Sequence, residues 1–206
     1  MEIPVKDEER GVIAARLALA LSAAMTPALT ATAALALITW RFESGWRAAG
    51  FFALTLLFGS AFGTVLAVVR ARWKGLADVH IAERRDRPAF FAACAGVAAV
   101  GWAVLALVGA PLPLLVLMAA YGACLGAIAL TTLVTKPSVH CAAMAALAGA
   151  LLIVRPVFVP VAVAGLAALT WARLYRRRHT LWECLLGTAI GAATVAAAYL
   201  ALKLLT

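Results

Sequence analysis

The sequence predicts an all-α protein, a polytopic transmembrane helical bundle of six to seven spans. Apolar residues make up 66% of the 206 residues, and only 13% are charged. The mean hydropathy is +1.01. A soluble domain is nearer half apolar and a quarter charged, and a chain of this size cannot hide so much apolar surface from water. The composition therefore argues against a soluble enzyme, a disordered chain and a nucleic-acid-binding domain. The expected surroundings are a lipid bilayer.

A helix that crosses a bilayer needs about 20 mostly apolar residues. Seven stretches approach or exceed that length, at about 13–39, 48–69, 89–109, 113–135, 138–154, 157–172 and 183–204. We expect Pro27 to kink the first stretch rather than end it, because neighbouring helices can satisfy the freed backbone groups. Only Arg155 and Pro156 separate the short fifth and sixth stretches, so six spans and seven both fit. We expect one membrane-embedded domain over residues 1–206, with residues 1–11 as a polar flank.

Basic residues concentrate in three segments that share one membrane face with the N-terminus if there are seven spans. They are Arg70, Arg72, Lys74, Arg84, Arg85 and Arg87, then Lys136, then Arg173, Arg176, Arg177 and Arg178. Basic loops tend to stay in the cytoplasm. We therefore expect an integral protein of a prokaryotic cytoplasmic membrane with this face inside. The net charge of +9 suits anionic lipid headgroups or an anionic substrate.

Each of the three histidines, His80, His140 and His179, falls in one of these basic segments. Arginine offers phosphoryl oxygens a fixed fork of donors. Histidine can act as a nucleophile or a general acid near neutral pH. This combination predicts phosphate-ester chemistry at a membrane surface. The alternative for each histidine taken singly is an ordinary interfacial residue.

Local spacing suggests a role for each of the later two histidines. His179 and Glu183 are four residues apart, so on a helix they would share a face and hydrogen-bond. A carboxylate on one imidazole nitrogen fixes the tautomer and leaves the other nitrogen able to attack. His140 follows Lys136-Pro-Ser138 at the start of an apolar stretch, where helix N–H groups attract anions. His140 could there protonate a leaving oxygen, although a plain helix start is the alternative.

Acidic residues are expected to play a supporting part. Asp78, Glu83 and Asp86 lie beside Arg84 and Arg85 in the first basic segment, and we interpret them as partners of those arginines rather than as Mg²⁺ ligands. We expect no metal and no cofactor. The four cysteines have no CxxC spacing and are interpreted as small core residues.

Together the three segments resemble the type 2 phosphatidic acid phosphatase superfamily, whose motifs read K-x6-RP, PSGH and SR-x5-H-x3-D. Order and spacing match over residues 78–190, about half of the chain. Here the motifs read His80-x6-Arg87-Pro88, Pro137-Ser138-Val139-His140 and Ala172-Arg173-x5-His179-x3-Glu183. Four positions differ: His80 replaces lysine, Val139 replaces glycine, Ala172 replaces serine and Glu183 replaces aspartate.

The resemblance implies a bundle with a core of that type and a metal-independent lipid phosphatase that works through a phosphohistidine. By it His179 is the nucleophile, Glu183 orients His179, and His140 protonates the leaving group. The phosphate-binding residues it implies are Arg87, Arg173, His80, Ser138 and Arg84. The implied substrate is a membrane lipid phosphate, either a prenyl phosphate or diphosphate or one of the phosphatidic acid type.

Three other functions stay open at this point. The first is a transport or binding protein with an anionic-lipid site, although no span carries a charge near its middle, where substrate pathways have one. The second is a membrane prenyltransferase, although those enzymes place paired Asp-rich motifs around Mg²⁺ and here only Asp78 and Asp86 occur in a loop. The third is a non-catalytic scaffold. The sequence predicts no particular oligomeric state.

Overall fold

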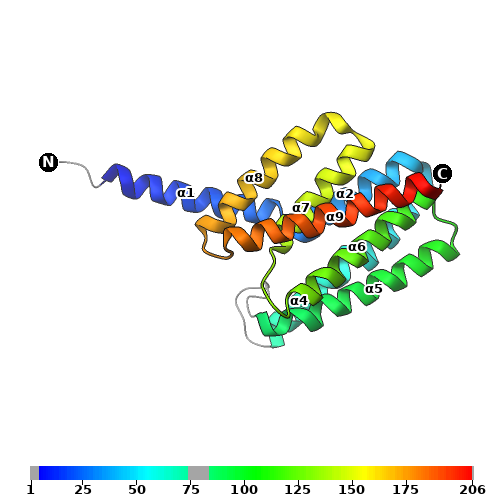
Figure 1. Cartoon of the computed structure of the whole chain (residues 1–206), viewed down its shortest axis with the longest axis horizontal. Coiled ribbons are helices and arrows are strands. Elements are labelled where there is room, and N and C mark those ends of the chain that lie inside the picture. Colours follow the sequence, from blue (N-terminus) through cyan, green and yellow to red (C-terminus); the bar gives the residue numbers. More distant parts are fainter. Residues whose placement is uncertain (1–4, 74–83, 206) are drawn as a thin grey trace.

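The computed structural model describes residues 5–73 and 84–205, and every regular element in that part of the chain is helical (Figure 1). The all-α prediction is therefore confirmed. In chain order the elements are α1 (Val5–Ala24), α2 (Pro27–Phe42), α3 (Gly45–Thr55), the π-helix η1 (Leu56–Ala61), α4 (Phe62–Trp73), the 3₁₀ turn η2 (Arg84–Asp86), α5 (Arg87–Leu107), α6 (Leu112–Thr131), α7 (Val139–Val154), the 3₁₀ turn η3 (Pro156–Phe158), α8 (Val159–Tyr175) and α9 (Leu181–Leu205).

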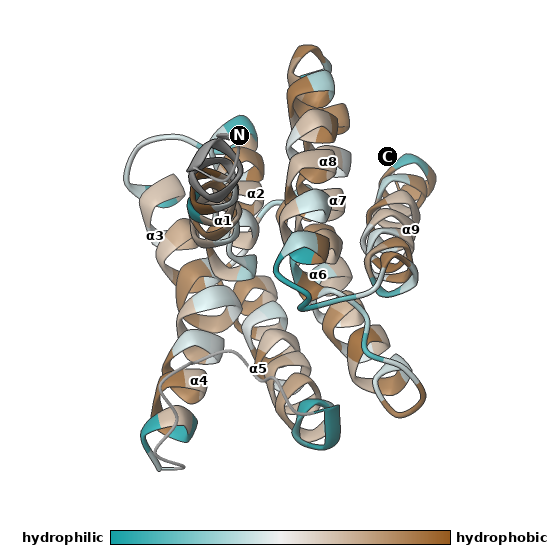
Figure 2. Ribbon diagram, turned by 90° about the vertical axis from the view of Figure 1, so that its left-hand side faces the viewer, coloured by the Kyte–Doolittle hydropathy of each residue, from teal (hydrophilic) through white to brown (hydrophobic). Residues whose placement is uncertain are grey.

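Five helical segments within the described residues are long and apolar enough to cross a membrane. They are Gly45–Trp73, Arg84–Leu107, Leu112–Thr131, Pro156–Tyr175 and Leu181–Leu205. The bent pair α1 and α2 makes a sixth if it acts as one span, whereas α7 has only 16 residues. Hydrophobic residues run along the helices and hydrophilic ones gather at their ends (Figure 2). The chain is thus a membrane-embedded helical protein, and a seventh span would require the short α7.

Pro27 breaks the first apolar stretch instead of only kinking it. Helix α1 ends at Ala24, α2 begins at Pro27, and their axes differ by 45°. Thr26 between them is extended, and its hydroxyl oxygen accepts a hydrogen bond from Leu29 N at 3.3 Å. A Thr cap followed by proline is a strong helix start, since proline lacks the N–H that would be unsatisfied there. The combination of cap and proline explains why a new helix begins.

Helix α9 packs directly on the backbone of α7 through two glycines. A Cβ on Gly187 would overlap the carbonyl oxygen of Ser138, and a Cβ on Gly191 would overlap that of Ala142. Small residues of this kind allow helices in lipid to approach closely. Ser138 N also donates a 2.9 Å hydrogen bond to Glu183 O. The start of α7 is therefore held against the start of α9.

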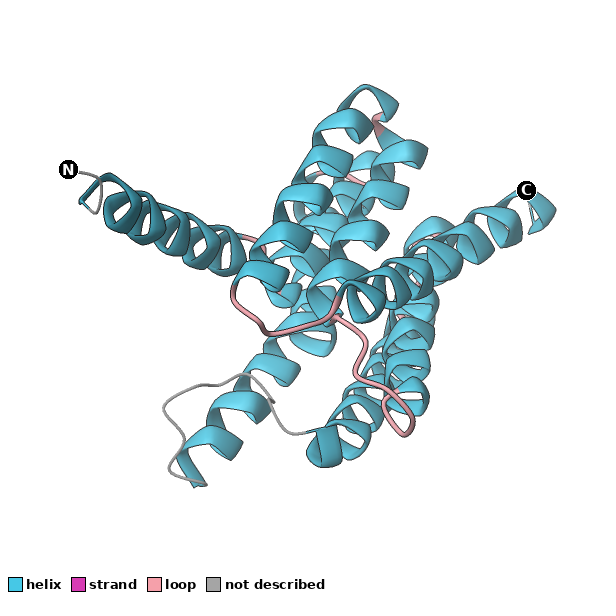
Figure 3. Ribbon diagram, turned by 60° about the vertical axis from the view of Figure 1, so that its left-hand side comes forward, coloured by secondary structure: helices cyan, strands magenta, loops and turns pink. Residues whose placement is uncertain are grey.

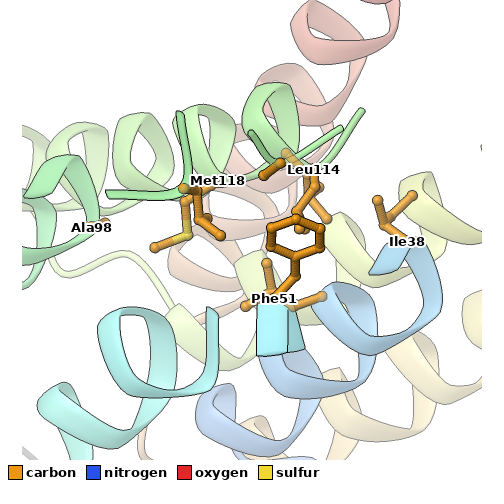
Figure 4. Packing of buried hydrophobic residues seen from close by; sticks show 9 residues of the cluster. Ile38, Phe51, Ala98, Leu114 and Met118 are labelled. Atoms are coloured by element: carbon orange, nitrogen blue, oxygen red, sulfur yellow. The ribbon is translucent and has the colours of Figure 1, made fainter. Parts of the chain in front are cut away.

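A hydrophobic core cluster lies toward the C-terminal end of α5 and the N-terminal end of α6. Ile38 from α2, Phe51 from α3, Ala98 from α5, and Leu114 and Met118 from α6 meet there (Figure 4). Arg87 begins α5 and Lys136 follows α6, so the basic residues and this cluster occupy opposite ends of the same two helices. All four cysteines are buried and free, as expected for small core residues.

Candidate functional site

Three separate parts of the chain meet at one end of a cavity of about 350 Å³. The loop between α6 and α7 and the turn between α8 and α9 converge beside the start of α9 (Figure 3). The third part is the start of α5, which contributes Arg87. The cavity is lined mainly by apolar side chains, and six basic groups line its end: Arg87, Lys136, His140, Arg173, Arg178 and His179. We call these six residues the basic cluster. The cluster contains five of the positions to which sequence spacing drew attention, together with Arg178.

His179 is held by a capping box rather than by a turn of helix. Thr180 caps α9: its hydroxyl oxygen accepts from Glu183 N at 3.3 Å, and Glu183 Oε2 accepts from Thr180 N at 3.0 Å. The same carboxylate oxygen lies 3.1 Å from His179 Nδ1. A carboxylate can only accept here, so Nδ1 carries the proton and Nε2 keeps its lone pair. The predicted His179–Glu183 hydrogen bond is confirmed, although His179 precedes the helix.

The turn after α8 brings His179 back over Arg173. Arg177 has a φ of +50°, and Arg178 N donates to Arg173 O at 3.1 Å while Arg177 N donates to Leu174 O at 2.9 Å. This pattern is a Schellman C-cap with Arg177 in the position usually taken by glycine. It reverses the chain within four residues. Arg173 at the end of α8 and His179 before α9 therefore line the same cavity.

Arg87 and Arg173 are buried cations, with exposed fractions of only 4% and 5%. Arg87 Nη2 donates to Pro137 O at 2.7 Å, and its guanidinium lies over the Phe91 ring at 5.3 Å. The Nε atoms of both arginines make no hydrogen bond to any described residue. Buried donors without partners are costly. A bound anion in the cavity would supply the missing acceptors.

The electrostatics of the cluster keep His179 neutral. Burial is the main influence, and repulsion from Arg173 adds to it, so that the pKa of His179 falls to about 4 although Glu183 acts in the opposite direction. Burial and repulsion from Arg87 likewise lower the pKa of Lys136. A neutral imidazole at physiological pH can act as a nucleophile without first losing a proton. The cluster is thus a strongly cationic site that contains an uncharged histidine.

His140 lies in the first turn of α7, is 97% buried and lines the cavity with His179. Its position follows from Ser138, whose hydroxyl oxygen caps α7 by accepting from Cys141 N at 3.4 Å. Ser138 itself is fully buried and is not among the residues that line the cavity. In the structure Ser138 therefore positions His140 by capping α7 and lies outside the cavity lining, and its role as a phosphate ligand stays a prediction.

The first predicted motif is only partly at the site. Arg87 lines the cavity, but Arg84 donates to the carbonyl oxygens of Val134 and Leu133 at 2.9 and 2.6 Å and is not among the lining residues. Asp86 forms an ion pair with Arg70 of α4. Predicted positions 78, 80 and 83 lie outside the described residues. Of these two predicted phosphate-binding arginines, Arg87 therefore lines the cavity and Arg84 does not.

Two further cations line the site beyond those predicted as phosphate ligands. Lys136 and Arg178 both line the cavity, and Lys136 acts electrostatically on His179. A signal was present in the sequence, because Lys136 directly precedes the Pro137-Ser138 pair and Arg178 directly precedes His179. Lys136 supplies an ammonium group at the site.

Comparison with protein-family models, with curated proteins and with solved structures finds no match to this chain.

Proposed function

We propose that the protein is a membrane-embedded lipid phosphatase that hydrolyses a phosphomonoester or diphosphate through a phosphohistidine on His179. One observation carries this proposal. A buried, neutral His179 has its Nδ1 on the Glu183 carboxylate at 3.1 Å and lines a cavity that is cationic at this end and apolar elsewhere. An oriented imidazole nucleophile beside phosphate-binding cations is the arrangement that phosphoryl transfer needs.

The first step transfers the phosphoryl group to the protein. His179 Nε2 attacks phosphorus with its lone pair, a P–N bond forms, and the P–O bond to the lipid alcohol breaks. His140, which lines the same cavity, donates a proton to the leaving oxygen as general acid. Glu183 stabilises the positive charge that develops on the His179 ring, because its carboxylate accepts a hydrogen bond from Nδ1–H throughout.

The second step returns His179 to its starting state. Water attacks the phosphoryl group, His140 takes a proton from that water, and the P–N bond breaks to release inorganic phosphate. Each step ends with His179 neutral or phosphorylated and with His140 in the state that the next step requires. His140 thus gives up one proton in the first step and regains it in the second, whereas His179 keeps its Nδ1 proton throughout.

The cations hold the reacting phosphate and offset its charge. The unpartnered Nε atoms of Arg87 and Arg173 are donors for phosphoryl oxygens, and Lys136 and Arg178 add two positive charges at the same end of the cavity. Donors that are fixed before the reaction stabilise charge without reorganisation. These four side chains do the work that a bound metal ion does in other phosphatases, so we expect the reaction to persist in EDTA.

The substrate is a lipid because the phosphate site opens into an apolar cavity within a membrane-length bundle. By the positive-inside rule, the basic cluster faces the cytoplasm of a prokaryotic cell. A single cysteine introduced beside the cluster, at Arg176, tests this orientation in intact cells. Labelling by a membrane-impermeant maleimide only after cell lysis would support the cytoplasmic face, and labelling of intact cells would contradict it.

The proposed function is tested by phosphate release from purified protein in detergent. The substrates are prenyl and diacylglycerol phosphates with EDTA present, and His179→Ala is the control. Release that is insensitive to EDTA and lost in His179→Ala would support the proposal. A requirement for Mg²⁺ would favour the prenyltransferase alternative, and tight binding of a lipid phosphate without release would favour a binding, transport or scaffold protein.

A further inference from the structure

The cavity that leads away from the basic cluster is built into the bundle. Folded proteins pack closely and contain few voids larger than a water molecule, so about 350 Å³ of space requires an explanation. Small residues such as Gly59, Gly63, Ala120 and Ala146 line it from η1, α4, α6 and α7. A larger side chain at these positions would fill the space. Four separate helical elements thus contribute to keeping it open.

The far end of the cavity is closed by the hydrophobic core. Leu35 of α2 and Leu117 of α6 line the cavity and also belong to the core cluster of Figure 4. Ile128, near the basic cluster, and Leu117 are both lining residues on α6, and they lie about 16 Å apart along the helix axis. Tyr121 OH donates to Gly59 O at 2.8 Å, which ties the π-helix η1 to α6. The cavity therefore has a charged end and an apolar end.

The volume limits what the apolar part can hold. An apolar cavity of about 150 Å³ accepts benzene, with six carbon atoms, so about 350 Å³ holds about 14 carbon atoms on the same scale. A diacyl lipid with two palmitoyl chains carries more than twice that number. Because this volume includes the basic end, where the phosphate group would lie, it leaves room for about a dozen carbon atoms of one chain, far fewer than two palmitoyl chains carry.

We propose that the site selects lipid phosphates with a single hydrocarbon chain, whose first dozen or so carbon atoms lie in the cavity between the basic cluster and Leu117. The inference rests on the proposed function for the identity of the headgroup. The charged end binds the phosphate through Arg87 and Arg173, two buried arginines that line the cavity and whose Nε atoms have no hydrogen-bond partner among the described residues. The apolar wall binds the chain. A prenyl chain and a single linear alkyl or acyl chain share this chemistry.

The test uses phosphonates, which have no P–O ester bond to the chain and so cannot be hydrolysed. Tetradecylphosphonate, octylphosphonate and a dipalmitoyl phosphonate are compared by the rise in thermal unfolding temperature of the purified protein. We expect tetradecylphosphonate to bind at least about 10-fold more tightly than octylphosphonate, because additional methylene groups are buried. The dipalmitoyl compound should compete poorly with it.

Two neighbouring alanines provide a matched pair of variants. Ala120 lines the cavity, whereas Ala119 is exposed on α6. Ala120→Phe should abolish the preference for tetradecylphosphonate over octylphosphonate, and Ala119→Phe should preserve it. If Ala120→Phe unfolds, Gly63→Leu fills the cavity from α4, where an added Cβ meets Cys94 Sγ at an ordinary 3.4 Å.

The outcomes separate this inference from the proposed function. Equal stabilisation by both chain lengths, strong competition by the dipalmitoyl compound, or an unchanged preference in the cavity-filling variants would overturn it. Chain-length-dependent phosphonate binding with no phosphate release from tetradecyl phosphate would uphold the single-chain site and refute the phosphatase. A comparison of the affinities of prenyl and alkyl phosphates with equal numbers of carbon atoms then shows whether the site prefers a prenyl chain or a linear one.

Discussion

Replacement of Gly187 by alanine should damage the site although Gly187 is not one of the residues that line the cavity. The new Cβ would overlap Ser138 O and would lie 3.0 Å from the carbonyl carbon and 3.1 Å from the nitrogen of the same residue. Carbon atoms in contact prefer about 3.5–4.0 Å, and backbone cannot rotate aside as a side chain can. The start of α7 must therefore move away from α9 by up to about 1 Å.

That displacement has two measurable consequences. Overpacking of this kind costs about 1–3 kcal/mol, and stretching the Ser138 N to Glu183 O bond, 2.9 Å long in the native protein, weakens a buried hydrogen bond. His140 moves relative to His179, since the first lies on α7 and the second is fixed to α9. A misplacement of about 1 Å between reacting groups costs about 100-fold in rate.

The assay is thermal unfolding in detergent, with phosphate release measured on the same preparation. Gly96→Ala is the matched control, because Gly96 is exposed on α5 and an added Cβ there meets nothing within 4 Å. Gly96→Ala should be neutral or stabilising by about 0.5–1 kcal/mol. A Gly187→Ala protein that unfolds at the wild-type temperature would refute the described contact between α7 and α9, whatever its activity.

Four further predictions concern His179 and the groups that position it or act on its charge. Glu183→Gln keeps an acceptor for the Thr180 N–H but removes the charge that fixes the tautomer of His179, so phosphate release should fall at least about 100-fold with little change in unfolding temperature; near-normal turnover would contradict the orienting role. Burial and nearby cations hold the pKa of His179 at about 4. His179 therefore stays neutral well below pH 6.5, and kcat/KM should fall through protonation of His179 only near pH 4. Lys136→Met removes one of those cations, so the pKa of His179 should rise and the acid limb of kcat/KM should move to higher pH. The substrate titrates identically with both proteins, so an acid limb that does not move would contradict its assignment to His179. Arg177→Gly relieves a left-handed backbone that costs a non-glycine residue about 1–2 kcal/mol and should raise the unfolding temperature by about 2–8 °C; a decrease would contradict the Schellman turn.

Short-range spacing predicted the parts of the site that depend on local structure. His179 and Glu183 meet because four residues separate them and a capping box forms at Thr180. Continuous apolar stretches of about the length needed to cross a membrane predicted the helices. The convergence of the second and third basic segments was predicted from the two apolar stretches between them, which the structure forms as helices α7 and α8.

Features that depend on tertiary packing were not predictable in this way. Arg84 and Arg87 are three residues apart, yet Arg84 contacts carbonyl groups after α6 and Arg87 lines the cavity. The hydroxyl of Ser138 is used as a helix cap, which competes with the phosphate role that the motif suggested. The volume of the cavity depends on how the surrounding helices pack and has no counterpart in the spacing of any single motif.

The most direct test of the central claim is to identify the phosphorylated residue. His140→Asn should slow hydrolysis of the phosphoenzyme, and a nitrophenyl phosphate substrate needs no general acid because its leaving oxygen is already stable as an anion. The protein is incubated with this substrate, quenched at alkaline pH to preserve phosphohistidine, and digested for mass spectrometry. We predict one phosphoryl group on His179 and none in the His140→Asn/His179→Ala double variant. Turnover with no phosphoryl group on His179, or with the label on another residue, would contradict the mechanism.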